Sequence, residues 1–347
     1  MIERASKTEN DRTWCFWEKT DGFFSPIVHR EWSNLNFFSD YFSQVLDIAP
    51  YRYKMIRGID FYQYCFNEIK KHPNIELKNG DVREIATVDN TRRIIFDNTT
   101  FATGDAIIFN SIPDQQKPSA NSIHLLQHFK GWVIESEQPA FSPVTATLMD
   151  FRVNQDDGTA FCYTLPLSYT GALIEFTLFS EKLLQPGRYD DELKKYISEV
   201  LKIPAYRVLQ TEFGVIPMTN ARMPFYRDGI YHIGTAGGQT KPSSGYTFQF
   251  IQKHSDQIVD CLVNGKSLQQ LPAMPKRFRF YDTIMLRLLK KREYDGDRIF
   301  SDLFKRNRAV DVLRFLDNET SPGEEIRLLS SLPTWPFLKS ALQIGRA

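Results

Sequence analysis

Length, composition and charge already exclude several classes of protein. The chain has 347 residues, enough for two packed lobes or one large α/β domain, and its 42% hydrophobic and 24% charged residues are ordinary for a globular protein. A formal net charge of +1 provides no general attraction to nucleic acid. The four cysteines form no CxxC pair, which argues against a metal site and a disulfide framework and fits a reducing cytoplasm. No stretch approaches the roughly 18 apolar residues that span a bilayer, and residues 1–17 contain no apolar segment of a secretory signal.

The first third of the chain combines a helix with short strands. Apolar residues fall on one face of a predicted helix over 53–71, and Pro73 ends it. Strands are predicted at 75–78, 83–88 and 93–97. The apolar run 106–109 is typical of a buried parallel strand that ends in a loop.

The middle third has the alternating pattern of an antiparallel sheet. Strands are predicted at 144–153, 160–167 and 172–180, and the first two are joined by a polar hairpin turn at 154–158. An amphipathic helix over 191–201 and a strand over 207–216 follow. A short strand over 229–234 then leads into a glycine-rich loop, and a helix is predicted from 246 to 264.

The segment 276–308 is both basic and apolar, with eleven Lys or Arg against five Asp or Glu. One interpretation is a terminal helix docked on the body of the protein. The other is a helix that lies on an anionic membrane surface. The high content of 27 Phe and 15 Tyr is also open to two explanations, an aromatic-rich core or a site for a large apolar ligand.

Three clusters carry candidate chemistry. The glycine-rich segment 234–245 allows close backbone approach, and the following helix directs free N–H groups toward an anion, although a plain turn and cap explains it equally well. Glu175 shares a strand face with Leu173, Thr177 and Phe179, where apolar surroundings favour the neutral acid, unless this strand lies at an edge and the carboxylate faces water. Asp150 and Arg152 lie on one strand face and are expected to form a structural ion pair.

These segments resemble the flavin-dependent lycopene β-cyclase family, in particular its bacterial, Bacteroidetes-like branch. The resemblance covers most of the chain and rests on ordered motifs at 10–18 (NDRTWCFWE), 127–132 (QHFKGW), 149–152 (MDFR), 163–166 (YTLP), 172–180 (ALIEFTLFS), 214–218 (GVIPM) and 234–248. Several separated motifs in order are far more specific than any single one.

The resemblance implies a glutathione-reductase-like FAD-binding α/β fold with a β-rich substrate domain and C-terminal helices. The expected division is a partial FAD-binding lobe (1–112), the substrate domain (113–213), a return to the FAD-binding lobe (214–265) and a helical region (266–347) that contacts the membrane. The family's signature acid falls on Glu175. Its cofactor-binding positions fall on Glu3, Gly234, Thr235, Gly237, Gly238, Ser244 and Gly245. The residues expected to line the substrate path, with core packing as the alternative for each aromatic, are Asp150, Phe151, Tyr163, Phe176 and Phe179.

One departure from the family pattern concerns the cofactor. The family begins with a strand, a GxGxxG turn and a helix that hold the flavin pyrophosphate, and this chain contains no GxGxxG. The first strand, turn and helix of the Rossmann lobe are therefore expected to be missing, through a start codon assigned too late or a truncated gene.

The resemblance implies a non-redox, acid-catalysed cyclisation of lycopene and related acyclic carotenoids to β rings. The implied cofactor is reduced FAD, with NAD(P)H as the reductant, and no metal is expected. The expected location is the cytoplasmic side of the inner membrane, bound to its surface. The alternatives are another flavin-dependent oxidoreductase or monooxygenase of the same fold, or an inactive truncated remnant.

Overall fold

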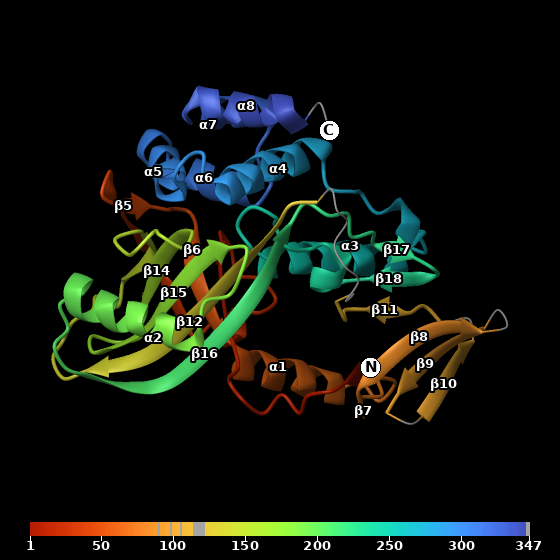
Figure 1. The fold of residues 1–347 in the computed structure, drawn as a ribbon. Coiled ribbons are helices and arrows are strands. Elements are labelled where there is room, and N and C mark those ends of the chain that lie inside the picture. Colours follow the sequence, from red (N-terminus) through yellow and green to blue (C-terminus); the bar gives the residue numbers. More distant parts are fainter. Residues whose placement is uncertain (89–90, 98, 105, 114–121, 345–347) are drawn as a thin grey trace.

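A computed structural model describes residues 1–88, 91–97, 99–104, 106–113 and 122–344, and its centre is a seven-stranded sheet (Figure 1). The strands pair in the order β16-β12-β15-β14-β13-β4-β5. Every neighbouring pair is antiparallel except β13 and β4, which run parallel. The strands are β4 (Asn34–Phe38), β5 (Ser43–Asp47), β12 (His124–Ser136), β13 (Thr145–Asp150), β14 (Thr159–Pro166), β15 (Gly171–Ser180) and β16 (Tyr206–Thr219).

The antiparallel strands predicted from alternation are confirmed as β13, β14 and β15, and the strand predicted at 207–216 is the middle of β16. Sequence alone did not indicate β12, the strand between β15 and β16. Its alternation is hidden because buried polar residues, among them His128, share it with apolar ones. The sheet also takes β4 and β5 from before residue 112, and β16 continues past residue 213, so the sheet includes strands from both sides of these expected boundaries.

Two apolar layers cover the sheet. On one face lies α2 (Pro186–Lys195), which continues as a wider helical turn over Tyr196–Val200 and confirms the predicted helix at 191–201 with an earlier start (Figure 1). Ile174 and Phe176 of β15 pack in this layer. On the other face, Leu173 and Phe179 of the same strand join the larger core with the C-terminal helices. The two faces of β15 therefore belong to different cores, as a period of two requires.

A three-stranded sheet, in the order β2-β6-β3, contributes to the larger core. It consists of β2 (Thr13–Glu18), β3 (Arg30–Trp32) and β6 (Arg52–Arg57), and α1 (Gly58–Lys70) follows β6 directly. The helix predicted over 53–71 is therefore wrong in its first five residues. Tyr53 and Met55 have apolar side chains that fit either structure, but hydrogen bonds from strands on both sides hold them in β6.

Short strands form the remainder of the β structure. The bounds are β1 (Ile2–Glu3), β7 (Lys78–Asn79), β8 (Val82–Val88), β9 (Thr91–Phe96), β10 (Thr99–Gly104), β11 (Phe109–Asn110), β17 (Tyr226–Arg227) and β18 (Ile230–His232). Parallel pairs join β1 to β7 and β11 to β18. The strands predicted at 83–88, 93–97 and 229–234 are confirmed within a residue or two at most ends. The strand predicted at 75–78 is wrong, since only Lys78 is in a strand.

The prediction of a buried parallel strand over 106–109 is only partly correct. Its parallel pairing is confirmed, but the strand begins only at Phe109. Ile108 is buried, whereas the Ile107 side chain is 53% exposed. Hydrophobicity alone could not show that only one neighbouring strand, β18, covers this segment among the described residues.

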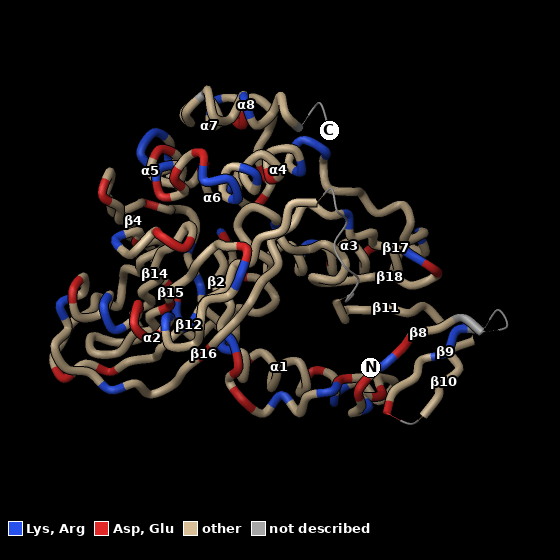
Figure 2. The backbone as a smooth tube through the Cα atoms, viewed as in Figure 1, with Lys and Arg blue, Asp and Glu red and all other residues tan. Residues whose placement is uncertain are grey.

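The C-terminal part is helical. Its elements are α3 (Phe248–Val263), which confirms the predicted helix, and α4 (Lys276–Lys291), α5 (Gly296–Arg306), α6 (Ala309–Leu316), α7 (Pro322–Ser330) and α8 (Thr334–Ile344), with 3-10 turns at Ser25–Ile27, Gly234–Gly237 and Leu268–Gln270. Ile284, Leu288 and Leu289 of α4 are buried in the larger core, so this helix is docked on the body. Figure 2 shows charges of both signs along α4, α5 and α6. No helix among the described residues is both long and apolar enough to cross a membrane.

Candidate active site

A second carboxylic acid faces Glu175 across the sheet. The register places Glu175 opposite Gly131 of β12, and Gly131 opposite Glu212 of β16. Residues aligned in neighbouring strands point to the same face. Gly131 contributes no side chain, and a Cβ there would lie 2.9 Å from Glu212 Cγ and 3.1 Å from Glu212 Oε1. Glu212 therefore extends over Gly131 toward Glu175.

Two threonine hydroxyls fix the outer oxygens of this pair. Thr177 Oγ1 donates to Glu175 Oε1 at 3.1 Å, and Thr13 Oγ1 of β2 donates to Glu212 Oε2 at 2.8 Å. Glu212 Oε1 is buried and has no donor among the described residues while both acids are ionised. A proton on Glu175 supplies that missing donor, because two carboxylates in contact cannot both remain charged away from water.

The electrostatics of the pair agree with this geometry. Burial raises the pKa of Glu175 well above its usual range, and the charge and hydrogen bond of Glu212 raise it further. Burial also raises the pKa of Glu212, while hydrogen bonds from Thr13 and Glu175 oppose that rise. Both directions favour a protonated pair, most strongly at Glu175. Although protein surrounds it, the Glu175 side chain keeps partial solvent accessibility, so its proton can be transferred.

Two of the groups that face the pair are neutral. Tyr163 of β14 lies opposite Glu175, and burial raises the pKa of its hydroxyl well above its usual range. Burial and the charges of Glu175 and Glu212 likewise raise the pKa of the Cys15 thiol. In the described part of the chain, neither glutamate forms an ion pair with Lys or Arg. The site is a largely buried surface on which the protonated form of the acid pair is favoured.

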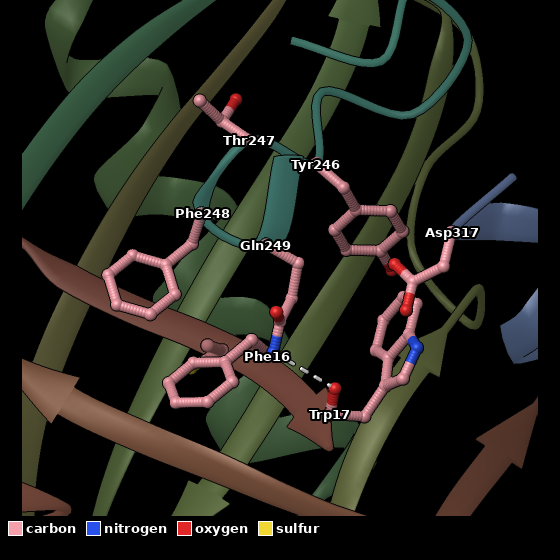
Figure 3. Close-up of a pocket in the computed structure, with 8 residues that line it drawn as sticks. Phe16, Trp17, Tyr246, Thr247, Phe248, Gln249 and Asp317 are labelled. Atoms are coloured by element: carbon pink, nitrogen blue, oxygen red, sulfur yellow. Dashed lines mark hydrogen bonds between the residues drawn. The ribbon is translucent and has the colours of Figure 1, made fainter. Parts of the chain in front are cut away.

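A small aromatic pocket adjoins this surface through Cys15 (Figure 3). The rings of Trp17 and Tyr246 meet edge to face with centroids 4.9 Å apart, and Phe16 and Phe248 lie 4.7 Å apart. The lining residues are Cys15, Phe16, Trp17, Tyr246, Thr247, Phe248, Gln249 and Asp317. These side chains come from β2, the start of α3 and the end of α6, so the pocket lies where three separate segments meet.

A much larger cleft of about 770 Å³ borders the glycine-rich loop, a size typical of ligand sites. Thr235, Gly237 and Gly238 line it. A Cβ at Gly237 would lie 2.0 Å from the His232 carbonyl oxygen, and Gly238 has a φ of 76°, so both positions favour glycine. Asn318 also lines the cleft, and its amide nitrogen is buried with no partner among the described residues. This unused donor and the close backbone fit a ligand with acceptor atoms.

A buried ion pair anchors the end of this loop. Lys241 Nζ lies 2.9 Å from Asp282 Oδ1 of α4, and each side chain is 2% exposed. Ser243 Oγ donates to the same Asp282 oxygen at 2.6 Å, and Lys241 Nζ also donates to Asn318 Oδ1 at 2.8 Å. These bonds hold the glycine-rich loop against α4 and the residues that follow α6.

Comparison with known proteins identifies the family of this fold and site. The family model described as "Lycopene cyclase protein" matches residues 1–342. The chain belongs to this family. It is 25% identical over 358 residues to the lycopene beta-cyclase of Pseudescherichia vulneris, covering 97% of this chain and 88% of that one. It is 26% identical over 260 residues to the lycopene beta-cyclase of a Paracoccus species, covering 69% and 65%.

Solved structures share the fold of this lycopene cyclase family member. A geranylgeranyl bacteriochlorophyll reductase-like protein from Thermoplasma acidophilum matches with a TM-score of 0.60 at 11% identity, covering 96% of this chain and 92% of that one. A flavin-dependent brominase matches with a TM-score of 0.52 at 14% identity, covering 93% and 84%. The p-nitrophenol 4-monooxygenase of Pseudomonas putida gives 0.52 at 12%, covering 90% and 81%. These identities show a common architecture.

The predicted cofactor positions fall into separate places. Thr235, Gly237 and Gly238 line the cleft, whereas Gly234, Ser244 and Gly245 are not part of its lining. Gly245 instead packs on β12, where its Cβ would lie 2.0 Å from Gln127 Oε1. The Oγ of Ser244 is buried without a partner among the described residues. Glu3 ends β1, and its carboxylate accepts the Ala5 N–H at 3.0 Å and lies 3.7 Å from Lys7 Nζ.

The predicted substrate-lining residues divide between the two faces of the sheet. Tyr163, Phe151 and Phe179 pack in the same core layer on the Glu175 side. Phe176 lies in the opposite layer, under α2. Asp150 is fully buried, with Arg152 at 2.6 Å and the Tyr196 hydroxyl donating to it at 2.9 Å, which confirms the structural ion pair.

Sequence reasoning missed Glu212 as a partner of Glu175. Glu212 and Glu175 are far apart in the chain, and only the register of β15, β12 and β16 brings them together. The available signal was the single glycine in the QHFKGW motif of β12. An isolated glycine inside a strand indicates that other groups approach the backbone closely.

Proposed function

We propose that this protein is a lycopene β-cyclase that closes the ψ end groups of lycopene and related acyclic carotenoids to β rings, with γ-carotene as the intermediate. The observation that carries the proposal is Glu175, a carboxylic acid that lies beside Glu212 and whose burial raises its pKa, in a member of the lycopene cyclase family. A proton donor of raised pKa is the group that acid catalysis at neutral pH requires.

The chemistry begins with transfer of the Glu175 proton to the terminal double bond of the substrate. The resulting tertiary cation is attacked by the next double bond, which closes a six-membered ring, and loss of a ring proton gives the β end group. No electrons leave or enter the substrate. The barrier is the formation of a carbocation, so negative charge in a dry site lowers it, and the charge on the acid pair supplies such a field.

The cleft beside Thr235, Gly237 and Gly238 is the proposed site for FAD, in reduced form with NAD(P)H as the reductant. A reduced flavin bound there would supply negative charge rather than electrons. The fold supports this assignment, since flavin-dependent enzymes share it. Residues 1–112 and 214–265 form the proposed cofactor lobe and 113–213 the proposed substrate domain, and residues of α3 and of the loop before it line the cleft.

The proposed place of action is the cytoplasmic surface of the inner membrane, where a hydrocarbon substrate dissolves. Some of the cations of 276–308 are already paired within the protein. Lys290 pairs with Glu181 at 2.8 Å, and Arg277 pairs with the buried Glu325 at 2.9 Å. A further candidate is the surface of α7 and α8 with the exposed apolar residues Ile326, Trp335, Leu338 and Leu342. Trp335, Leu338 and Leu342 recur at helical spacing on one face.

Liposome sedimentation tests this surface. The triple variant Trp335→Ser, Leu338→Ser, Leu342→Ser is expected to lose most vesicle binding while its thermal melting is unchanged, because these side chains lie outside the core. A control variant carries the same number of serines at the exposed Val208, Leu209 and Val263. Equal binding of the triple variant and the wild type would assign the membrane contact elsewhere.

Pigment analysis in lycopene-accumulating bacteria tests the activity itself. The wild type is expected to convert lycopene to β-carotene, also without oxygen, which separates cyclisation from monooxygenase chemistry. Glu175→Gln is expected to lower cyclisation by at least about 10²-fold, the usual contribution of a general acid. Glu192→Gln, which changes a partly buried acid of α2 on the opposite face, is the matched control. Cyclisation by Glu175→Gln at the wild-type rate would remove Glu175 from the mechanism.

A further inference from the structure

We infer that Glu212 is the positioning residue of the acid: it shares the Glu175 proton across Gly131 and takes that proton back into the pair at the end of each turnover. The inference rests on the proposed function, which assigns the acid to Glu175. It adds Glu212 of β16 to the residues that support the acid, and it gives a physical reason for a glycine at position 131 of β12.

The geometry requires three residues in one line. Glu175, Gly131 and Glu212 occupy directly opposed positions on β15, β12 and β16. Any side chain at position 131 would enter the space that Glu212 occupies, since an added Cβ lies 2.9 Å from Glu212 Cγ and 3.0 Å from Leu173 Cδ1. The gap at Gly131 therefore lets these two side chains approach each other above β12.

The described groups around Glu212 provide few hydrogen-bond donors and no positive charge. Its Oε2 accepts from Thr13, and its Oε1 has no other donor among the described residues. The ionisable groups facing the pair are Cys15 of β2 and Tyr163 of β14, both held neutral, and the carboxylate of Asp11 ahead of β2. No cation in the described part of the chain pairs with either glutamate, so the shared proton is what stabilises the two carboxyl groups.

The proton balance of cyclisation explains why the pair takes a proton back at the end of each turnover. The Glu175 O–H bond breaks as a substrate C–H bond forms, which leaves two carboxylates beside a carbocation. A C–C bond closes the ring, a ring C–H bond breaks, and an O–H bond in the pair forms again. One proton leaves and one returns, so the pair is restored without a co-reactant. The doubly charged pair exists only while a cation is present to offset it.

Infrared spectroscopy of the carboxyl C=O band measures the shared proton without any turnover. In the wild type, one protonated buried carboxyl is expected to persist through neutral pH. Glu212→Gln removes the neighbouring negative charge and keeps a polar side chain of the same size. The pH at which the Glu175 band disappears is expected to fall by about one unit or more, the size of shift that a close like charge produces. The alkaline limit of cyclisation is expected to move with it.

Two further variants make the result decisive. Gly131→Ala separates the pair by steric contact and is expected to shift the band and the alkaline limit in the same direction, which keeps the inference testable should Glu212→Gln unfold. Glu192→Gln is expected to change neither. An unmoved band midpoint in both Glu212→Gln and Gly131→Ala would overturn the inference. The two proposals can also fail separately. If the band shifts in these variants but the wild type forms no cyclised pigment, the proposed function is wrong and the shared proton is still supported.

Discussion

Asp317 provides a quantitative test of the electrostatics of this fold. It ends α6 at the aromatic pocket of Figure 3, its side chain is 6% exposed, and Lys253 Nζ approaches it no closer than 3.9 Å. Burial raises its pKa from 3.8 to about 6. An acid whose folded pKa exceeds its unfolded pKa binds more protons when folded, so stability falls as the pH rises through about 4 to 6.

The magnitude follows from the shift. A difference of roughly 2 units at about 1.4 kcal/mol per unit corresponds to about 3 kcal/mol once the pH exceeds both pKa values. Asp317→Asn removes the charge and keeps the shape. It is expected to raise the free energy of unfolding by up to about 3 kcal/mol at pH 8, and by less than about 1 kcal/mol at pH 4.

Urea unfolding of the wild type and the variant, followed by circular dichroism at both pH values, measures this difference. Asp256→Asn, at an exposed position of α3, is the control and is expected to behave like the wild type at both pH values. A stabilisation by Asp317→Asn that is equal at pH 4 and pH 8 would show that Asp317 does not titrate in this window, and the reasoning from burial would fail.

Two further predictions concern the glycine-rich loop. Lys241→Met leaves Asp282 as an uncompensated buried charge and is expected to cost about 3–5 kcal/mol in urea unfolding, whereas the double variant Lys241→Met, Asp282→Leu should recover most of that loss; a double variant as unstable as the single one would show that packing, not charge, holds the loop. Gly245→Ala combines a φ of 71° with a Cβ 2.0 Å from Gln127 Oε1, while Gly265→Ala has a φ of 62° and open space. Gly245→Ala is therefore expected to lower the melting temperature clearly more than Gly265→Ala, whose cost is about 1 kcal/mol, and equal melting temperatures would refute the steric argument.

The sequence by itself determined the features that depend on near neighbours in the chain. The alternation of β13, β14 and β15, the turn between the first two, and the pairing of Asp150 with Arg152 two residues away are all local, and the structure confirms them. The strand pattern alone left Glu175 open between a buried acid and an edge carboxylate that faces water, and the family resemblance selected it as the acid. The family followed from ordered motifs along the chain, and the match over residues 1–342 confirms it.

Only the tertiary structure decided which distant segments meet. Tyr53, Met55 and Ile56 have apolar side chains that suit a helix or a strand, and pairing with β2 and β3 placed them in β6. The side-chain pattern of β16 does not reveal that Glu212 extends toward Glu175 over Gly131. The pattern of the glycine-rich loop likewise does not reveal that Lys241 pairs with Asp282 of α4. The physical reason is that strand register and helix docking are settled by hydrogen bonds and burial between segments, and these are contributions that no local pattern contains.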